Sequence, residues 1–169
     1  MHISETKLEG VLRIKLDNFI DHRGKYVETY NEDEYFKQNI TTKFIQDDIS
    51  ISKKNVLRGI HGDEQTTKLV SCLSGSFYLI VVNNDKDSDQ FKQWTSFNLS
   101  GDDDVQILIP EKFGNGHLVT SDEAIFHYKQ NTYYNPSGQF TILWNDPSYN
   151  FEWPIKTPIL SSRDEKGHF

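Results

Sequence analysis

The sequence predicts an all-β domain, an antiparallel sandwich or barrel among which a jelly roll ranks high. Three observations predict this fold class. About ten short apolar or alternating runs are separated by turn residues at intervals of about 8 to 12 residues. Aromatic residues make up 13% of the chain and cluster in those runs, as is typical of strands. Only the segment 31–38 predicts a helix, and 169 residues suffice for one domain with a sizeable core.

The first half of the chain predicts alternating strands with one short helix. Asp21-His22-Arg23-Gly24 is a turn sequence between strands, and Asn31 is a candidate N-cap for the helix. The segments on either side of Gly75 predict a hairpin, whose second strand is nearly all apolar and is expected to be covered on both faces. The strands expected in this half are 11–16, 25–30, 43–51, 67–73 and 76–83.

The second half predicts further strands and no domain boundary. Residues 100–104 are an expected acidic turn, and 111–116 an expected turn that contains glycine. Residues 141–144 are expected to form a last central strand. No repeat or low-complexity segment interrupts the chain, so a single domain is expected over residues 1–169. The strands expected in this half are 94–99, 105–109, 118–119, 124–130 and 141–144.

Composition and charge argue against several classes of protein. A net charge of -7 and a pI of about 5.3 disfavour a non-specific nucleic-acid binder. The single cysteine, Cys72, excludes an intramolecular disulfide framework and fits a reducing compartment. The first residues lack the apolar run of a signal peptide, and no stretch reaches the length of a membrane span. A soluble, cytoplasmic protein with no nucleic-acid or membrane partner is therefore expected.

Residues 55–70 are the leading candidate for a functional site. Arg58, His61 and Lys68 lie in or beside apolar segments that predict strands. Burial of cations next to an imidazole is costly unless an anion accompanies them, which favours a site over a piece of core. A surface strand whose polar residues face water explains the same pattern. On these residues alone both interpretations stay open.

A series of short motifs, each weak by itself, follows in one order along nearly the whole chain. The motifs are Phe19-x-Asp21-x-Arg23-Gly24, Gln46-Asp47, Val56-Leu57-Arg58-Gly59-Ile60-His61, Lys68-Leu69-Val70, Ile109-Pro110, Tyr128-Lys129, Tyr133-Tyr134-x-Pro136, Trp144-Asn145-Asp146, Trp153-Pro154 and Leu160-Ser161-x-x-Asp164. Together they resemble the dTDP-4-dehydrorhamnose 3,5-epimerase family of nucleotide-sugar epimerases. The resemblance implies a cupin-type jelly-roll β-sandwich with one or two short helices, and a homodimer. It also implies a nucleotide diphosphate-linked 4-keto sugar as substrate, with no cofactor or metal.

The resemblance implies a catalytic role for each of four residues. His61 is the expected base that removes a proton beside the ketone, since an imidazole titrates near neutral pH. Asp164 matches the carboxylate that pairs with this histidine and fixes its tautomer. Lys68 matches the lysine that stabilises charge developing on the C4 oxygen. Tyr128 matches the residue that returns a proton from the opposite face and inverts the carbon. Without the resemblance, a solvated aspartate, a surface lysine and a core tyrosine would be the simpler interpretations.

Other matched positions imply substrate binding. Arg23 and Arg58 match positions associated with the pyrophosphate and the sugar, because a planar guanidinium suits phosphate oxygens. Phe19 and Gln46 match residues that line the nucleotide and sugar site. Asn115 is also an expected substrate-binding residue, at the position of a histidine in the family pattern.

Several departures from the family pattern surround the expected base. His61 is followed by Gly62-Asp63 where members commonly have Tyr-Gln or Phe-Gln, and the link to the next motif is shorter. The family's second active-site histidine, in a Phe-Ala-His-Gly-Phe segment, is Asn115 within Phe113-Gly114-Asn115-Gly116-His117. Asp48 stands where an asparagine is usual. An added negative charge near a bound phosphate is unfavourable unless it is offset.

These departures leave the exact substrate open. The nucleotide is dTDP or GDP, and the sugar is a deoxy sugar or a heptose, so that a GDP-heptose is one candidate. The product would serve capsule or other surface polysaccharide biosynthesis. We hypothesise that the substrate differs from the usual rhamnose precursor and that C3 alone is inverted.

Three rival functions start from the same residues. His61, Asp63 and His117 form a His-x-Asp…His pattern that on a jelly roll can hold non-haem iron, as in a metal-dependent cupin oxygenase. A 3,4-ketoisomerase of a nucleotide 4-keto sugar performs similar proton transfers, but its motif usually carries a second histidine soon after the first. A sugar-nucleotide binding module without catalysis would not need the full set of four catalytic residues.

Overall fold

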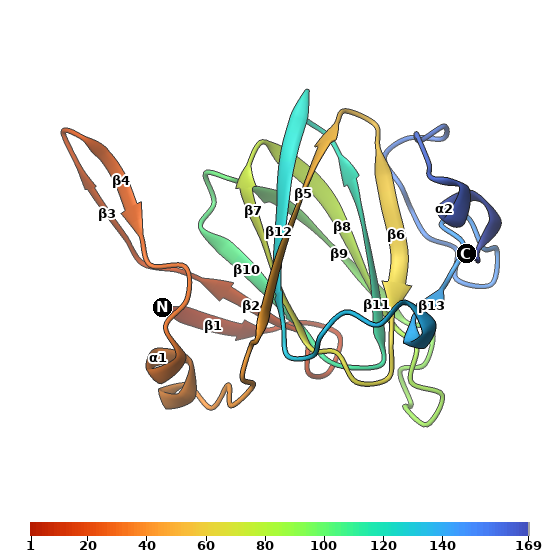
Figure 1. The fold of residues 1–169 in the computed structure, drawn as a ribbon, viewed down its shortest axis with the longest axis horizontal. Helices are drawn as coiled ribbons and strands as arrows, with labels where there is room; N and C mark the ends of the chain where they lie inside the picture. The colour runs from red at the N-terminus through yellow and green to blue at the C-terminus, as the bar shows by residue number, and fades with distance from the viewer. Residues whose placement is uncertain (169) are drawn as a thin grey trace.

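The computed structural model describes residues 1–168, which form a sandwich of two antiparallel sheets (Figure 1). The six-stranded sheet has the order β1-β2-β10-β7-β12-β5, and the five-stranded sheet has the order β13-β6-β11-β8-β9. The predicted all-β sandwich of the jelly-roll type is confirmed. The strands of the two sheets are β1 (His2–Glu5), β2 (Leu12–Lys15), β5 (Gln46–Lys53), β6 (Leu57–Gly62), β7 (Lys68–Ser74), β8 (Ser76–Asn83), β9 (Trp94–Ser100), β10 (Val105–Ile109), β11 (Phe113–Val119), β12 (Glu123–Gln130) and β13 (Phe140–Thr141).

The main apolar core lies between the two sheets. Val70 and Ile107 of the six-stranded sheet cluster with Phe77 and Leu79 of the five-stranded sheet, and each is at most 1% exposed. Alternation along each strand sends these side chains inward, where burial contributes about 25 cal/mol per Å² of apolar surface. A second apolar cluster packs the helix α1 (Glu32–Lys37) against neighbouring positions of the six-stranded sheet.

The expected hairpin around Gly75 is wrong. β7 pairs with β10 and β12 in one sheet, whereas β8 pairs with β9 and β11 in the other. The chain crosses between the sheets at Gly75, whose φ is +71°. Any other residue at this position would place its Cβ atom 2.0 Å from the Glu123 carbonyl oxygen. A single linking residue is shorter than the loop of the commonest hairpins, so two adjacent strands need not be partners.

Other expectations are corrected in detail. The expected turn 111–116 is mostly part of β11, a strand buried along its whole length. The expected central strand 141–144 is reduced to β13, which pairs only with β6 at the sheet edge. β1 was not expected. In segments rich in glycine or aromatic residues, the local sequence indicates strand or turn only weakly. Pairing with neighbouring strands therefore determines whether these segments form strands.

The expected short helix is confirmed as α1, but its cap differs. Asn31 precedes the helix, yet its side chain makes no capping hydrogen bond and instead donates to Glu28 Oε1 at 3.2 Å. A second helix, α2 (Ser162–Lys166), follows the last strand, and a 3-10 turn, η1 (Pro136–Gly138), precedes β13. Within residues 1–168, no helix has the length and apolar character needed to cross a membrane.

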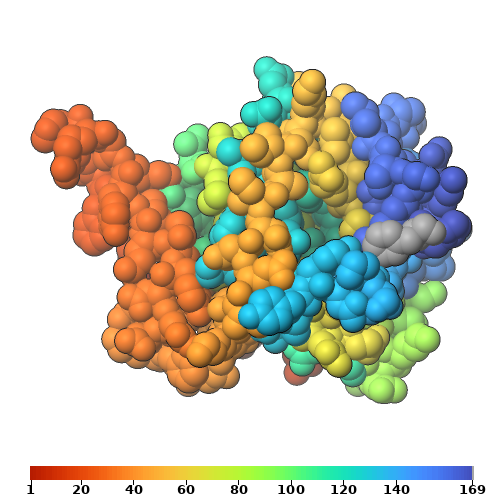
Figure 2. Space-filling view, viewed as in Figure 1, coloured from red at the N-terminus to blue at the C-terminus, as the bar shows by residue number. Residues whose placement is uncertain are grey.

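A two-stranded hairpin stands out from the sandwich. It consists of β3 (Asn18–Asp21) and β4 (Gly24–Val27), so the strand expected at 25–30 is shorter and has an unexpected partner. Figures 1 and 2 show this hairpin projecting from the body at the left of the view. Phe19 is 70% exposed and Ile20 is 74% exposed, which is unusual for large apolar side chains. We call residues 18–27 the hairpin arm.

Candidate active site

A cavity of about 380 Å³ opens between the two sheets. The five-stranded sheet lines it with His61 and the six-stranded sheet with Lys68 and Tyr128, while α2 supplies Asp164. These are the four residues expected to be catalytic, although they are widely spaced in the sequence. The fold therefore brings all four around one cavity.

An irregularity between β6 and β11 orients two of the lining residues. Arg58 pairs with His117 and His61 pairs with Asn115, so three steps along β6 match two steps along β11. Gly59 lies within this bulge with a φ of +121°, and a Cβ atom there would come 2.4 Å from the Gly116 Cα. Residues three apart on a regular strand point to opposite faces. The extra residue lets Arg58 and His61 line the same cavity.

His61 and Asp164 form a close pair. The His61 Nε2 lies 2.6 Å from Asp164 Oδ1, and the Asp164 side chain is only 3% exposed. Ser161 holds the second carboxylate oxygen by donating from its Oγ to Asp164 Oδ2 at 2.8 Å, and it accepts from the Asp164 N–H at 3.2 Å. Ser161 is also the N-cap of α2, and Gly167 ends that helix with a left-handed φ of 80°. The helix cap thus positions the carboxylate.

The surroundings of this pair favour a neutral imidazole beside an ionised carboxylate. Burial lowers the pKa of His61, and although Asp164 opposes this, the net pKa stays below its usual value. Burial alone would raise the pKa of Asp164, but hydrogen bonds from His61, Ser161 and the Gly59 N–H bring the pKa below its usual range. At neutral pH, His61 can therefore accept a proton, and Asp164 stabilises the cation that results.

Lys68 lies close to two other lining residues. Its Nζ donates to Asn115 Oδ1 at 3.3 Å and lies 5.8 Å from the centre of the Tyr128 ring. Burial lowers the pKa of Lys68 to about 8, while Asp63 partly offsets this and Arg163 adds to it. The ammonium is still mostly charged at neutral pH, so Lys68 can stabilise a developing negative charge.

Tyr128 is held in its neutral form. It pairs with Asp48 across β12 and β5, and both side chains line the cavity. Burial raises the pKa of Tyr128 to about 12, and a hydrogen bond to the Asp48 carboxylate adds to the effect. A phenol in this state keeps its proton at neutral pH and can donate it.

Comparisons with known proteins identify the family. The family model for dTDP-4-dehydrorhamnose 3,5-epimerase matches residues 5–169. The enzyme of that name from Salmonella typhimurium is 41% identical, covering 97% of this chain and 92% of its own. This chain belongs to the dTDP-4-dehydrorhamnose 3,5-epimerase family. The predicted resemblance is therefore confirmed.

Two further relatives show the range of the family. The dTDP-6-deoxy-D-glucose-3,5-epimerase of Legionella pneumophila, solved in complex with dTDP-4-keto-L-rhamnose, superposes with a TM-score of 0.94. It is 34% identical, and the match covers 99% of this chain and 91% of that one. A dTDP-4-dehydrorhamnose 3-epimerase of Streptomyces niveus is 28% identical, covering 98% of this chain and 82% of its own.

Three expected binding residues of the family pattern lie at or beside the cavity. Arg58 lines it and donates from Nε to Ser52 Oγ at 2.9 Å, and Asn115 lines it beside Lys68. Gln46 lies beside the cavity, where its Nε2 donates to Asp48 Oδ2 at 2.7 Å and its Oε1 accepts from the Tyr134 N–H at 2.9 Å. Gln46 thus supports two lining residues.

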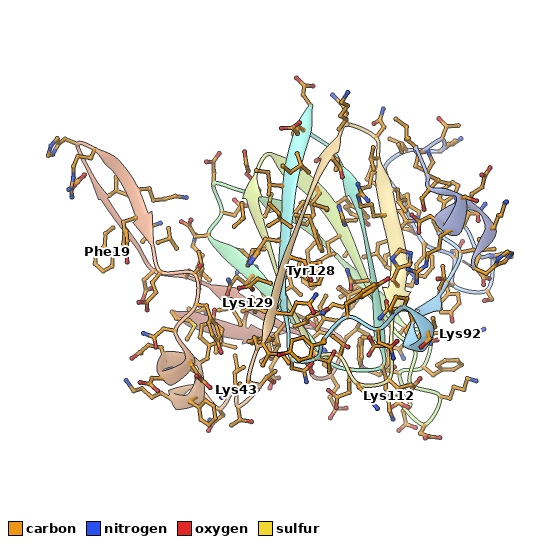
Figure 3. The ribbon with its side chains drawn as sticks, in the orientation of Figure 1. Phe19, Lys43, Lys92, Lys112, Tyr128 and Lys129 are labelled. Atoms are coloured by element: carbon orange, nitrogen blue, oxygen red, sulfur yellow. The ribbon has the colours of Figure 1, made fainter. Side chains whose placement is uncertain are left out.

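Phe19 and Arg23, also expected from the family pattern, are not brought to this cavity. Both lie on the hairpin arm, where they border a separate surface pocket. Figure 3 shows Phe19 on the projecting arm, well apart from Tyr128 in the body of the sandwich. The Arg23 side chain is 80% exposed and pairs with Asp21 of its own turn at 2.6 Å. Within one copy of this family member, the two residues do not contact the cavity.

The rival metal triad is not assembled. The Asp63 carboxylate accepts from the N–H groups of Gln65 and Thr66, from Thr66 Oγ1 and from Gln139 Nε2, all within 2.9 Å. The His61 Nε2 is already paired with Asp164. Over the described part of the chain, no group of three or more His, Cys, Asp or Glu side chains is arranged to hold a metal ion. These donors do not fit the iron site of an oxygenase.

Several lining residues were missed by the sequence reasoning. Ser161 could have been found, because Ser161-x-x-Asp164 followed by Gly167 is a helix-cap pattern that fixes where the carboxylate points. Ser50 and Gln130 carried no local signal. The lining residues to which the family resemblance gave no role are Ser50, His117, Gln130 and Ser161.

Proposed function

We propose that this protein is an epimerase of a nucleotide-linked 4-keto sugar. A proton on the carbon beside the ketone is removed from one face of the sugar and replaced from the other. The observation that carries the proposal is that the expected base and the expected acid lie on opposite walls. His61 belongs to the five-stranded sheet and Tyr128 to the six-stranded sheet, and both line one cavity. A sugar ring held between the sheets would present opposite faces to the two side chains.

The remaining groups fit the charge changes of this reaction. Removal of the proton produces an enolate, whose negative oxygen needs a cation or hydrogen-bond donors in a site with little water. Lys68 supplies an ammonium on the wall that carries Tyr128. Asp164 stabilises the imidazolium that His61 becomes. Arg58 adds a guanidinium for a phosphate or sugar oxygen.

The direct test is deuterium incorporation. The protein would be incubated in deuterated water with dTDP- and GDP-linked 4-keto sugars, and the products would be trapped by reduction. The relatives point to dTDP-4-keto-6-deoxy sugars as the first substrates to try. Solvent deuterium with inversion at C3 alone would support the 3-epimerase alternative, and label at both C3 and C5 the 3,5-epimerase alternative. No label in any sugar would contradict the proposed function.

We further propose a homodimer in which the hairpin arm reaches the cavity of the partner subunit. The arm carries exposed aromatic and apolar side chains and an arginine, and none of these contacts the cavity of its own chain. Exposed apolar patches of this kind mark interaction surfaces. A two-fold axis would place each arm on the other copy, which would give Phe19 and Arg23 the binding roles expected for them.

Mixing two weakly active variants tests whether the hairpin arm completes the partner's cavity. Arg23→Ala and His61→Ala would each be weakly active, but a mixed dimer would contain one cavity with an intact His61 and an intact arm from the partner. Random subunit exchange should therefore restore about a quarter of the wild-type rate. The measurement is the exchange rate before and after the variants are mixed and allowed to exchange subunits. Verified subunit exchange without recovery of activity would contradict the shared site.

The rate should depend on pH through His61 and Lys68. Exchange needs a neutral His61, whose pKa is lowered by burial, so kcat/KM should fall on the acid side only below about pH 6.5. Exchange also needs a charged Lys68, so kcat/KM should fall as the pH rises through about 8.

The substitution Lys68→Arg assigns the alkaline limb of that profile. A guanidinium stays protonated, so the loss of rate above pH 8 should disappear, even if the overall rate is lower. The measurement is the initial rate of deuterium exchange over roughly pH 5 to 10. An alkaline limb that is the same in Lys68→Arg and the wild type would assign this limb to another group.

A further inference from the structure

Unpartnered polar atoms gather at one cavity. In the described part of the chain, Ser50 Oγ, His117 Nε2 and Gln130 Nε2 are buried without a hydrogen-bond partner. All three side chains line the candidate active site. Buried polar groups in native proteins are nearly always hydrogen-bonded, and each exception calls for an explanation. An occupant of the cavity that carries hydroxyl groups would supply the missing partners.

The His117 ring is the most firmly fixed of the three side chains. His117 is 3% exposed, and its ring stacks on Phe126 with centroids 4.0 Å apart and planes 5° apart. The centre of the Phe77 ring lies 5.3 Å from the centre of the His117 ring. A phenylalanine would make these apolar contacts without burying an unpaired nitrogen. Packing alone therefore does not explain the imidazole.

His117 is suited to binding and not to proton transfer. Burial lowers the pKa of His117 to about 3, and the nearby Arg58 and His61 lower it further than Asp164 can restore. The ring is therefore neutral at physiological pH. A neutral imidazole has one donor and one acceptor nitrogen, which matches a sugar hydroxyl that can both accept and donate.

We propose that His117 is a specificity-determining residue that forms a hydrogen bond with a hydroxyl group of the sugar in the substrate. Ser50, on the facing sheet, is a second partner for the same part of the sugar. Ser50 pairs in register with Phe126, the residue on which the His117 ring stacks, so the two unpartnered side chains lie at the same level of the sandwich. This inference rests on the proposed function, because it assigns the sugar to this cavity.

The substrate implied is a sugar with a hydroxyl group directed at this wall. A wall built to hydrogen-bond a hydroxyl discriminates against a sugar that presents an apolar group there, because the imidazole and serine would be left unpaired. Asn115, two residues before His117 on the same strand, contacts Lys68 instead. Two positions of β11, two residues apart, thus contact the catalytic Lys68 and recognise the sugar respectively.

The test compares the affinity for a nucleotide with that for its sugar derivative. The wild type and the variant His117→Phe would be titrated with dTDP and dTDP-glucose, and with GDP and GDP-mannose. These sugars carry hydroxyl groups but no ketone, so they are not turned over. In His117→Phe the affinity for the nucleotide alone should be unchanged, while the gain from adding the sugar should fall roughly tenfold. His117→Gln, which keeps a donor and an acceptor, should retain much of the gain.

A matched control uses another imidazole that has a buried nitrogen without a partner, on a strand of the other sheet. His127, on β12, also has a buried nitrogen without a partner, but it pairs with Asp47 and does not line the cavity. The variant His127→Phe should leave the sugar-dependent affinity unchanged. The free His117→Phe protein should also unfold about 2–4 °C higher than the wild type, because an unpaired buried nitrogen is removed.

The outcomes separate the inference from the proposed function. If the wild type gains no affinity from either sugar, this inference is overturned, whereas the proposed function fails only if no 4-keto sugar takes up deuterium in the exchange test. If the wild type gains affinity and His117→Phe gains as much, the inference alone is overturned. A His117→Phe protein that folds but is less stable than the wild type would show that the imidazole has a structural partner, and this would also overturn it.

Discussion

Replacing His61 by asparagine or alanine is expected to abolish the exchange of the substrate's carbon-bound hydrogen with deuterated solvent. His61 is the one imidazole at the cavity that is paired with a buried carboxylate, and the reaction cannot begin without a base. General base catalysis contributes about 10²–10⁴-fold, so the rate should fall by at least that much. The measurement is deuterium uptake followed by NMR or mass spectrometry. Binding of the nucleotide alone should persist, because the proposed function places His61 beside the sugar and not beside the nucleotide.

The variant Asp164→Asn provides a comparison in which a smaller loss of rate is expected. It keeps the base but removes the charge that orients and stabilises it, so the loss should be smaller than in His61→Asn. Because Asp164 holds the pKa of His61 up, the acid limb should also move to lower pH. Near-normal exchange in a folded His61→Ala protein would remove this residue from the mechanism, and a wild-type rate in Asp164→Asn would remove the pair.

Replacing Tyr128 by phenylalanine is expected to separate exchange from inversion. His61 would still remove a proton and return a deuteron from the same face, so label should enter the substrate without a change of configuration. Inverted product should fall by about 10²–10⁴-fold, because the donor on the opposite wall is missing. The measurement is the ratio of labelled substrate to labelled, inverted product at early times.

Lys68→Ala serves as the contrast for Tyr128→Phe. Removing the ammonium takes away stabilisation of the enolate, which both processes share, so exchange and inversion should slow together. An unchanged yield of inverted sugar from Tyr128→Phe would assign the second proton to another residue or to water. A selective loss of inversion in Lys68→Ala would exchange the roles of the two residues.

Fold class and the composition of the site could be predicted from the sequence. Most strands alternate with period two and end at turn residues, so their approximate positions are largely local properties. The short helix at Glu32–Lys37 was predictable for the same reason. His61, Lys68, Tyr128 and Asp164 were recognisable because each lies within a motif that the family shares. Local sequence does not determine which strands pair. For this reason the segments on either side of Gly75 were wrongly expected to pair with each other.

Tertiary structure decided how these residues meet. The extra residue at Gly59 turns Arg58 and His61 toward one cavity, and no alternation pattern predicts this, because a bulge reverses the alternation. The cap of α2 brings Asp164 within 2.6 Å of His61 from more than a hundred positions away. Phe19 and Arg23 lie on the hairpin arm, outside the cavity of their own chain. His117 looked like a possible metal ligand in sequence, but the structure engages Asp63 and His61 with other partners and stacks the His117 ring on Phe126 beside the cavity. Residue types set which chemistry is available, and long-range packing sets which groups share a space.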